Sequence, residues 1–536
     1  MARMTTRVGH WTTCGSVLVA LSIALGCGTV ADNKPDAGGG SDDSGVTGDF
    51  SLAVVPTTLS VPIASSGTVT LHVERTGTVG DIMLSAPNLP AGVTASFATN
   101  PLPEGTDSTE VTFEIAGGTM PLTTDVTLRG TAGSLTQSTT LQLSATTITV
   151  TGKIRGGTPN VTVRIVGKQS VLSDASGNFT FTDVIPPYDL YVVGTTGLQI
   201  PGSSAIPAIA YYDDLTRPDP TVTRPLATTP FLILSSSAPI SGTKSGVGNT
   251  TNPIIIQWSN GGTPSTAVTG AGSFSHTASW GSSNTNSGTL YGLEFTRRPS
   301  GFPNTIVGFG STNATLTASQ HSVVNLIMAA ASSYAVTGTI TAPSGFPNPT
   351  ITLTQQFGNT SAVLHQTTGT DAAATLPVIS AGNASIHAST SAGGATTSYV
   401  HPLSAAADVS INLPAPAVQV APIHAATNVD HSTAFTFTAP AGVVSAVRII
   451  STSTSGTGQA AYFIYTTSDS VTIPDVSEVP LPPNQSMSWS VEGYGPYASV
   501  NDVAGVDPME TVSSTDFTGP KHFFTSSTTR DFTSAP

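Results

Sequence analysis

The chain has 536 residues, of which only 9% are charged, and its formal net charge is −14. A chain of this length does not fold around a single hydrophobic core, so about three to five domains are expected. The 17 basic residues are scattered rather than clustered, which argues against nucleic acid and against an anionic membrane surface as partners. Because Ser, Thr, Gly, Asn and Pro make up much of the remainder, the composition favours short strands and turns over helices.

Residues 1–26 are typical of a secretory signal. Arg3 and Arg7 precede the apolar run VLVALSIAL at residues 17–25, which is too short to span a bilayer comfortably. The tetrapeptide ALGC that ends at Cys27 resembles the bacterial lipobox, in which a peptidase cuts before a cysteine that carries diacylglycerol. The lipobox usually has leucine three residues before the cysteine, where this chain has Ala24. A secretory signal without a lipid on Cys27 is the alternative.

The resemblance implies that Cys27 is the lipid-attachment residue. The other cysteine, Cys14, leaves with the signal, so the mature chain would have no partner for a disulfide. Residues 27–49 then form a disordered acidic tether of Gly, Ser and Asp between the lipid and the folded part. We therefore expect an extracytoplasmic protein, lipid-anchored at the outer membrane or cell surface.

Residues 50–146 are expected to form the first folded module. Apolar and polar residues alternate at 51–55, 68–73, 110–115 and 124–129, the pattern of half-buried strands. The phrase NLPAGVTASF at residues 88–97 resembles one found in Ig-like modules of secreted bacterial proteins. This resemblance implies an Ig-like β-sandwich.

Three further segments, 147–226, 227–332 and 333–414, open with strands that contain the same glycine. These glycines, Gly152, Gly242 and Gly338, recur at nearly regular intervals, and we interpret the segments as a divergent tandem array. In the first segment the order is strand, strand, the turn DASGNF at residues 174–179, strand, Pro-Pro, strand. This order resembles the carboxypeptidase regulatory-like domain, a prealbumin-like β-sandwich that serves as an accessory module. The third segment is expected to be a divergent copy, and the middle one is the least regular.

The turn DASGNF is also the first candidate for a metal loop. An EF-hand loop needs acidic or amide ligands at alternate positions and a final glutamate, whereas Ser176 occupies a ligand position here and no glutamate follows. We expect instead that Asp174 accepts backbone hydrogen bonds, that Gly177 adopts a positive φ, and that Phe179 enters the core.

Residues 415–536 resemble a fibronectin type III-like module. The resemblance rests on the segments PIHAATNV at 422–429, TAFTFT at 433–438 and SWSVE at 488–492. In the last of these, Trp489 lies in a strand and is expected in the core. The whole fold is thus expected to be all-β, with serial β-sandwich modules after a signal peptide and a tether, and no amphipathic helix.

The search for catalytic residues finds none. The chain has no H-E-x-x-H, no G-x-S-x-G and no P-loop. His424 and His431 are the nearest histidine pair but lack metal-ligand spacing. Asp213 and Asp214, after two tyrosines, form the densest cluster of acids and aromatics, and we expect them to begin a loop.

These observations predict a non-enzymatic cell-surface lipoprotein with a structural, adhesive or ligand-presenting role and no cofactor. Its expected partners are the membrane, through the lipid, and extracellular glycans or other surface proteins, but not nucleic acid. A carbohydrate-binding surface protein is the alternative, because Trp258, Trp280 and Tyr291 lie beside Ser, Asn and Gly. Packing of these rings within a sheet is the favoured explanation. A second alternative is a cryptic hydrolase or its accessory protein.

Overall fold

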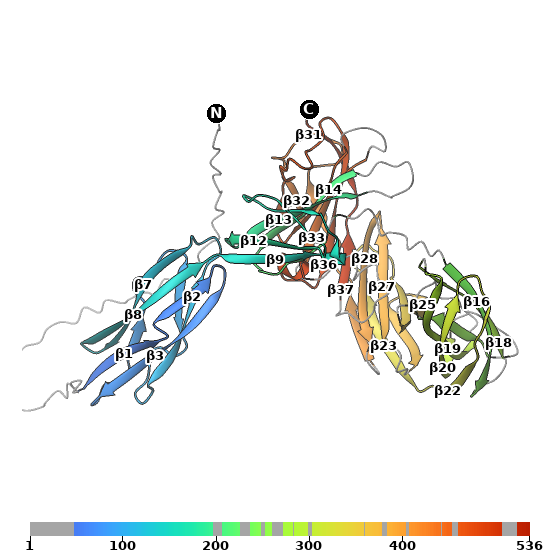
Figure 1. Cartoon of the computed structure of the whole chain (residues 1–536), viewed down its shortest axis with the longest axis horizontal. Helices are drawn as coiled ribbons and strands as arrows, with labels where there is room; N and C mark the ends of the chain where they lie inside the picture. The colour runs from blue at the N-terminus through green and yellow to red at the C-terminus, as the bar shows by residue number, and fades with distance from the viewer. Residues whose placement is uncertain are drawn as a thin grey trace, which may run out of the picture.

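The computed structural model is almost wholly β-structure (Figure 1). The residues that it describes are 48–196, 206–223, 225, 236–247, 252–259, 272–281, 283–297, 303–358, 360–377, 383–403, 407–440, 442–452, 459–505 and 522–536. Within them, the helical elements are a 3-10 turn, η1 (Arg155–Gly157), and one short helix, α1 (Val500–Val503). The expected all-β fold is confirmed. Cys27 and nearly all of the tether lie outside the described residues.

The N-terminal module is a sandwich of two four-stranded sheets. The first has the order β1 (Asp49–Val55), β3 (Ser66–Thr76), β6 (Ser108–Ile115) and β5 (Val93–Phe97), and the second β2 (Thr58–Pro62), β8 (Leu135–Thr146), β7 (Leu122–Ala132) and β4 (Met83–Ser85). Val111, Phe113 and Ile115 alternate along β6 and are almost fully buried. The alternation in the sequence therefore gives the strand and its buried face correctly.

The three repeated glycines occupy equivalent places in three different sheets. Two of these sheets have three strands each. One has the order β12 (Asn178–Val184), β9 (Ile148–Ile154) and β15 (Thr221–Val222), and the other has the order β26 (Asp371–Pro377), β23 (Ser333–Thr341) and β29 (Ala407–Asn412). The third has the order β17 (Ile254–Trp258), β19 (Thr285–Arg297), β20 (Pro303–Thr317), β22 (Leu326–Ala330), β16 (Ser236–Gly246) and β18 (Ser273–Trp280), with β21 (Ser322–Val323) also on β16. Each glycine strand (β9, β16, β23) has an antiparallel neighbour on one side and a parallel one on the other.

A side chain at any of these glycines would collide with a main-chain carbonyl. The obstructing oxygen belongs to Pro220, Val324 and Val409 for the three glycines in turn. Because a main-chain atom cannot move aside as a flexible side chain can, only glycine fits at these positions.

One long sheet links the strands of three modules. It has 14 strands. Its order is β11 (Val171–Leu172), β10 (Thr162–Ile165), β13 (Tyr188–Thr196), β14 (Ile206–Leu215), β34 (Ala461–Thr466), β33 (Val444–Ser451), β36 (Ser486–Gly495), β37 (His522–Ser526), β28 (Ala395–Leu403), β27 (Ala384–Ala392), β24 (Thr350–Phe357) and β25 (Thr360–Thr368). In addition, β38 (Arg530–Ser534) pairs with β36, and β31 (Ala426–Val429) pairs with β38. The strands of 415–536 therefore lie between those of 147–226 and those of 333–414.

Two strand pairings make this connection. β34 runs parallel to β14, with Ala208 opposite Ala461 and Tyr212 opposite Tyr465. β37 runs antiparallel to β28, with Val400 opposite His522. Figure 1 shows the C-terminal strands between the first and third repeats, although these residues come last in the chain. Serial modules in the sequence are thus not serial in space.

The long sheet is covered on both faces where it crosses the C-terminal strands. Val444 and Ala446 of β33 belong to the hydrophobic cluster that contains the β9 and β12 side chains. Val447 and Ile449 of the same strand belong to another cluster. That cluster includes side chains of β32 (Phe435–Thr438) and β35 (Ser470–Val471), which form a small sheet with β30 (Val418–Ala421). β33 is accordingly buried along nearly its whole length, rather than at alternate residues.

Trp489 confirms the sequence expectation for the C-terminal module. Its side chain is 1% exposed and meets Phe435 edge to face, with ring centroids 5.2 Å apart. Phe532 also meets Phe435 edge to face, with ring centroids 5.5 Å apart. These rings form the centre of the module's core.

Candidate functional site

The turn DASGNF is a structural turn. The Asp174 Oδ1 accepts the backbone N–H groups of Ser176 and Asn178, each at 2.8 Å. Hydrogen bonds from the backbone and side chain of Asn178 hold the pKa of Asp174 below its ordinary value. Gly177 has φ of 81°, and Phe179 is 3% exposed. The expectations for Asp174, Gly177 and Phe179 are all confirmed. The Asp174 carboxylate accepts hydrogen bonds within the turn itself.

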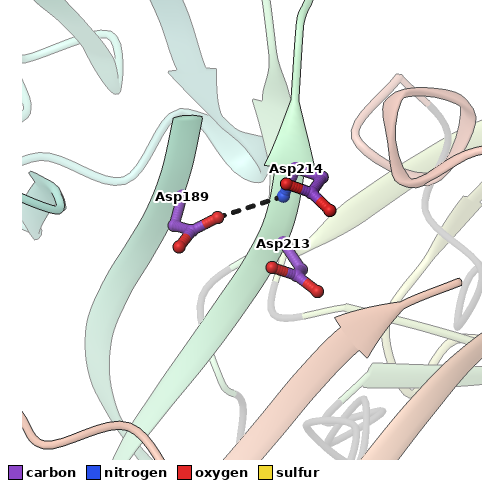
Figure 2. Close-up of side chains that lie close together, drawn as sticks. All are labelled: Asp189, Asp213 and Asp214. Carbon is purple, nitrogen blue, oxygen red and sulfur yellow. Dashed lines mark hydrogen bonds between the residues drawn. The ribbon is translucent and has the colours of Figure 1, made fainter. Parts of the chain in front are cut away.

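A cluster of three carboxylates lies at the end of two neighbouring strands of the long sheet (Figure 2). Asp189 is in β13, and Asp213 and Asp214 are in β14. The pairing of these strands shifts between Tyr188 and Leu190, which leaves two residues of β14 opposite the single residue Asp189, as in a β-bulge. One oxygen from each carboxylate lies within 4.8 Å of the other two. The expectation that Asp213 and Asp214 begin a loop was wrong, because both belong to the strand.

Hydrogen bonds from three residues hold the cluster. The Asp214 backbone N–H donates to Asp189 Oδ1 at 3.1 Å, and the Tyr211 hydroxyl donates to Asp189 Oδ2 at 2.7 Å. The Thr466 hydroxyl donates to Asp213 Oδ2 at 3.0 Å. Since Thr466 is in β34, this last bond joins segment 147–226 to the C-terminal module.

Burial, together with the neighbouring Asp189 and Asp214, raises the pKa of Asp213 to about 6, and the hydrogen bond from Thr466 opposes this shift. Burial and Asp189 also raise the pKa of Asp214. Burial and the neighbouring carboxylates disfavour the ionised form. At neutral pH the cluster therefore holds closely spaced negative charges at a cost in stability.

Carboxylate oxygens are ligands that calcium and magnesium prefer, and calcium takes about six to eight of them. The three aspartates offer one oxygen each. These are fewer protein oxygens than calcium takes, and Asp189 and Asp213 already accept hydrogen bonds. The cluster is better described as a polar contact between modules.

A second polar contact on this junction supports that description. Glu478 accepts hydrogen bonds from Arg164 at 3.3 Å and from the Tyr191 hydroxyl at 3.2 Å. Tyr191 stacks on Tyr211, with ring planes 9° apart. On the opposite face Tyr212 stacks on Tyr465 with centroids 4.8 Å apart.

The aromatic residues considered for sugar binding do not form an exposed platform. Trp258 and Trp280 are 0% and 1% exposed. Their indole N–H groups donate to Asn286 Oδ1 at 2.8 Å and to the Ser283 carbonyl at 2.9 Å. Tyr291 is half-buried and packs 5.5 Å from Phe357 of the next repeat. Packing within the sheets explains all three rings.

The two histidines also have separate structural contacts. His424 Nδ1 accepts the Asp531 backbone N–H at 3.2 Å, whereas His431 Nδ1 lies 3.1 Å from the Ile473 carbonyl. Sequence reasoning missed Asp189 and Thr466, because no spacing in the chain relates them to Asp213. The alternation of Tyr188, Leu190 and Val192 around Asp189 shows only that Asp189 is on the other face of its strand.

The fold is that of a chain of joined β-sandwiches with polar contacts between modules. No protein-family model and no curated protein matches the chain. Among solved structures, the Bacillus anthracis TIE protein is similar with a TM-score of 0.23 and 12% identity over 68% of this chain and 74% of that one. Domains 5–6 of the S-layer protein SbsC have a TM-score of 0.14 and 10% identity over 51% and 96%, and a streptococcal ancillary pilin has 0.12 and 9% over 50% and 98%. Similarity of this degree assigns no function to the chain.

Asp213→Asn is expected to raise the free energy of unfolding by about 1 kcal/mol near neutral pH, a value reduced for partial exposure. The folded pKa of about 6 lies above the ordinary 3.8, so the folded state binds the proton more tightly than the unfolded state. The wild-type carboxyl therefore contributes most to the free energy of unfolding below about pH 4, and this contribution is lost as pH rises through about 6. Asparagine keeps an oxygen for Thr466 and carries no charge.

Chemical unfolding of both proteins between about pH 4 and pH 8 measures the difference. It should grow as pH rises through this interval. Asp125→Asn, which alters an exposed strand carboxylate in the N-terminal module, is the control and should show no such trend. A variant less stable than wild type at neutral pH would contradict the assignment of a destabilising charge.

Proposed function

We propose that this chain is a non-enzymatic surface lipoprotein that holds its β-sandwich modules in a fixed arrangement away from a membrane, in a structural or adhesive role. The observation that carries the proposal is the long sheet, because strands of 415–536 complete a layer shared with two earlier modules. Modules joined only by linkers move independently by default, whereas a continuous ladder with a common core resists such movement.

Three hollows in the described part of the chain contain few ionisable side chains. Three hollows of about 740, 470 and 550 Å³ lie over residues 64–117, 241–325 and 287–315. Glu114 is the one ionisable side chain that lines them. An active site normally gathers several polar or titratable groups in one concave pocket, and these hollows do not.

The lipid anchor is the other half of the proposal, and Cys27→Ala tests it. Wild-type protein is expected to take up labelled palmitate in the producing bacterium and to sediment with membranes. Cys27→Ala should lose the label entirely and appear in the soluble fraction, because no thiol remains at the processing site. Cys14→Ala is the matched control and should keep both properties, since Cys14 lies within the signal. Label that persists in Cys27→Ala would overturn the anchor.

A further inference from the structure

Three polar side chains meet in a water-poor part of the middle repeat. Lys244 is in β16 and Glu294 in β19, and their side chains are 4% and 1% exposed. The Lys244 Nζ lies 3.0 Å from Glu294 Oε1, and the side-chain amide of Asn252 donates from Nδ2 to that same oxygen at 2.9 Å. One carboxylate oxygen thus holds an amine and a carboxamide next to each other.

Lys244 is also fixed against Asn252 directly. Its Nζ donates to the Asn252 main-chain carbonyl at 2.7 Å. Asn252 comes two residues before β17, which continues the sheet beside β19. The amine therefore has little freedom to leave the neighbourhood of this asparagine.

Apolar strands surround the three side chains. Lys244 pairs with Leu326, and Glu294 pairs with Ile254; both partners are fully buried members of the repeat's core. A buried lysine and glutamate are costly as separated charges. Transfer of one proton from the ammonium to the carboxylate leaves two neutral groups, so a site with little water favours this transfer more than water does.

We propose that Lys244 and Asn252 join through an isopeptide bond, with Glu294 as the proton carrier. Glu294 takes a proton from the Lys244 ammonium, and the neutral Nζ attacks Cγ of Asn252. The new Nζ–Cγ bond forms as the Cγ–Nδ2 bond breaks. Glu294 returns its proton to Nδ2, the second proton of Nζ follows by the same route, and an ammonium ion leaves, so that the neutral chain is lighter by one ammonia molecule. Glu294 ends ionised as it began, and no oxidant or other reactant is needed.

The geometry supplies what such a reaction requires. Glu294 Oε1 is within hydrogen-bond distance of both the nucleophile and the leaving nitrogen, as a group that acts first as base and then as acid must be. An amine and an amide held together in one fold react with effective concentrations far above those in solution.

Mass spectrometry of the full secreted chain tests the proposal. Trypsin does not cut after an acylated lysine, and Arg217 and Arg224 resist it because each precedes proline. The wild-type chain, denatured before digestion, should therefore give a single peptide over residues 169–297, lighter than its sequence by one ammonia molecule. An unjoined chain gives cleavage after Lys244 and two peptides of full mass.

Two variants test the roles of Glu294 as proton carrier and of Lys244 as nucleophile. Glu294→Gln keeps the size of the side chain but cannot carry the proton, and its digest should show cleavage after residue 244 in at least nine-tenths of the chain. Lys244→Arg keeps a positive charge opposite Glu294 but has no amine to acylate, and its full mass should equal that of its sequence. Circular dichroism checks that each variant is folded.

The wild-type result decides the matter even if a variant does not fold. Full-mass wild-type chain, with cleavage after Lys244, overturns the proposal, and so does conversion of Asn252 to aspartate without a crosslink. A crosslinked Glu294→Gln chain would overturn the role of Glu294. The proposal does not depend on the surface role above, and a missing crosslink leaves that role unaffected.

Discussion

A chain that ends at residue 414 is expected to lose the cooperative unfolding of the two modules at 147–226 and 333–414. Such a chain lacks β34 and β37, so β14 and β28 become open edges. It also exposes core side chains of the first repeat, since Tyr465 and Tyr494 belong to the same cluster as Tyr212 and Val150. Both losses act together, and we expect the unfolding midpoints of these modules to fall by about 10 °C or more.

Scanning calorimetry of the whole chain and the shortened chain measures this effect, with hydrogen exchange to assign each transition to its module. The control is a chain without residues 48–146, because the two sheets of the N-terminal module share no strand with the rest of the described chain. Its remaining transitions should stay within about 2 °C of those of the whole chain. Unchanged midpoints in the chain that ends at 414 would show that the shared sheet contributes nothing to stability.

Trp489→Ala is expected to lower the free energy of unfolding of the C-terminal module by about 3–5 kcal/mol. Trp489 is among the largest fully buried side chains, and it lies between β33 and β38 with Phe435 against its ring. Its removal leaves a cavity that a sheet fixed on both sides cannot close. The loss should be visible in denaturant as a shift of the midpoint at constant slope.

Trp489→Phe is the matched control for this cavity. The indole N–H has no acceptor among the described residues, so phenylalanine removes volume without leaving a partner unsatisfied. Its effect should be clearly smaller than that of alanine. Equal losses for the two variants would place the effect in the indole N–H rather than in packing.

Local features of this chain could be predicted from its sequence because they depend on neighbouring residues. The turn at Asp174, the core position of Trp489 and the strand at 110–115 each follow from a few adjacent side chains. The equivalence of Gly152, Gly242 and Gly338 could be recognised for the same reason, since each glycine recurs within a similar strand.

Contacts between distant segments could not be predicted. The sequence of β14 contains nothing that specifies β34 as its neighbour rather than another apolar strand, because main-chain hydrogen bonds are the same for all. Thr466 reaches Asp213 only through that pairing. Arg164 and Glu478 likewise meet across the junction between the two modules. Lys244 and Glu294 also come together only in the folded structure. Each occupies an inward position of its strand, where an apolar residue would normally lie.

The place of the C-terminal strands in the long sheet also has a consequence for synthesis. A chain is made from its N-terminus, so β14 and β28 both exist before β34 and β37 have been translated. During that interval the two older strands each present an unpaired edge, of the kind that recruits other chains. Residues 461–466 and 522–526 close these edges. The C-terminal strands therefore cover edges of earlier modules that would otherwise favour aggregation. A chain whose translation stops early lacks these strands and keeps both edges open.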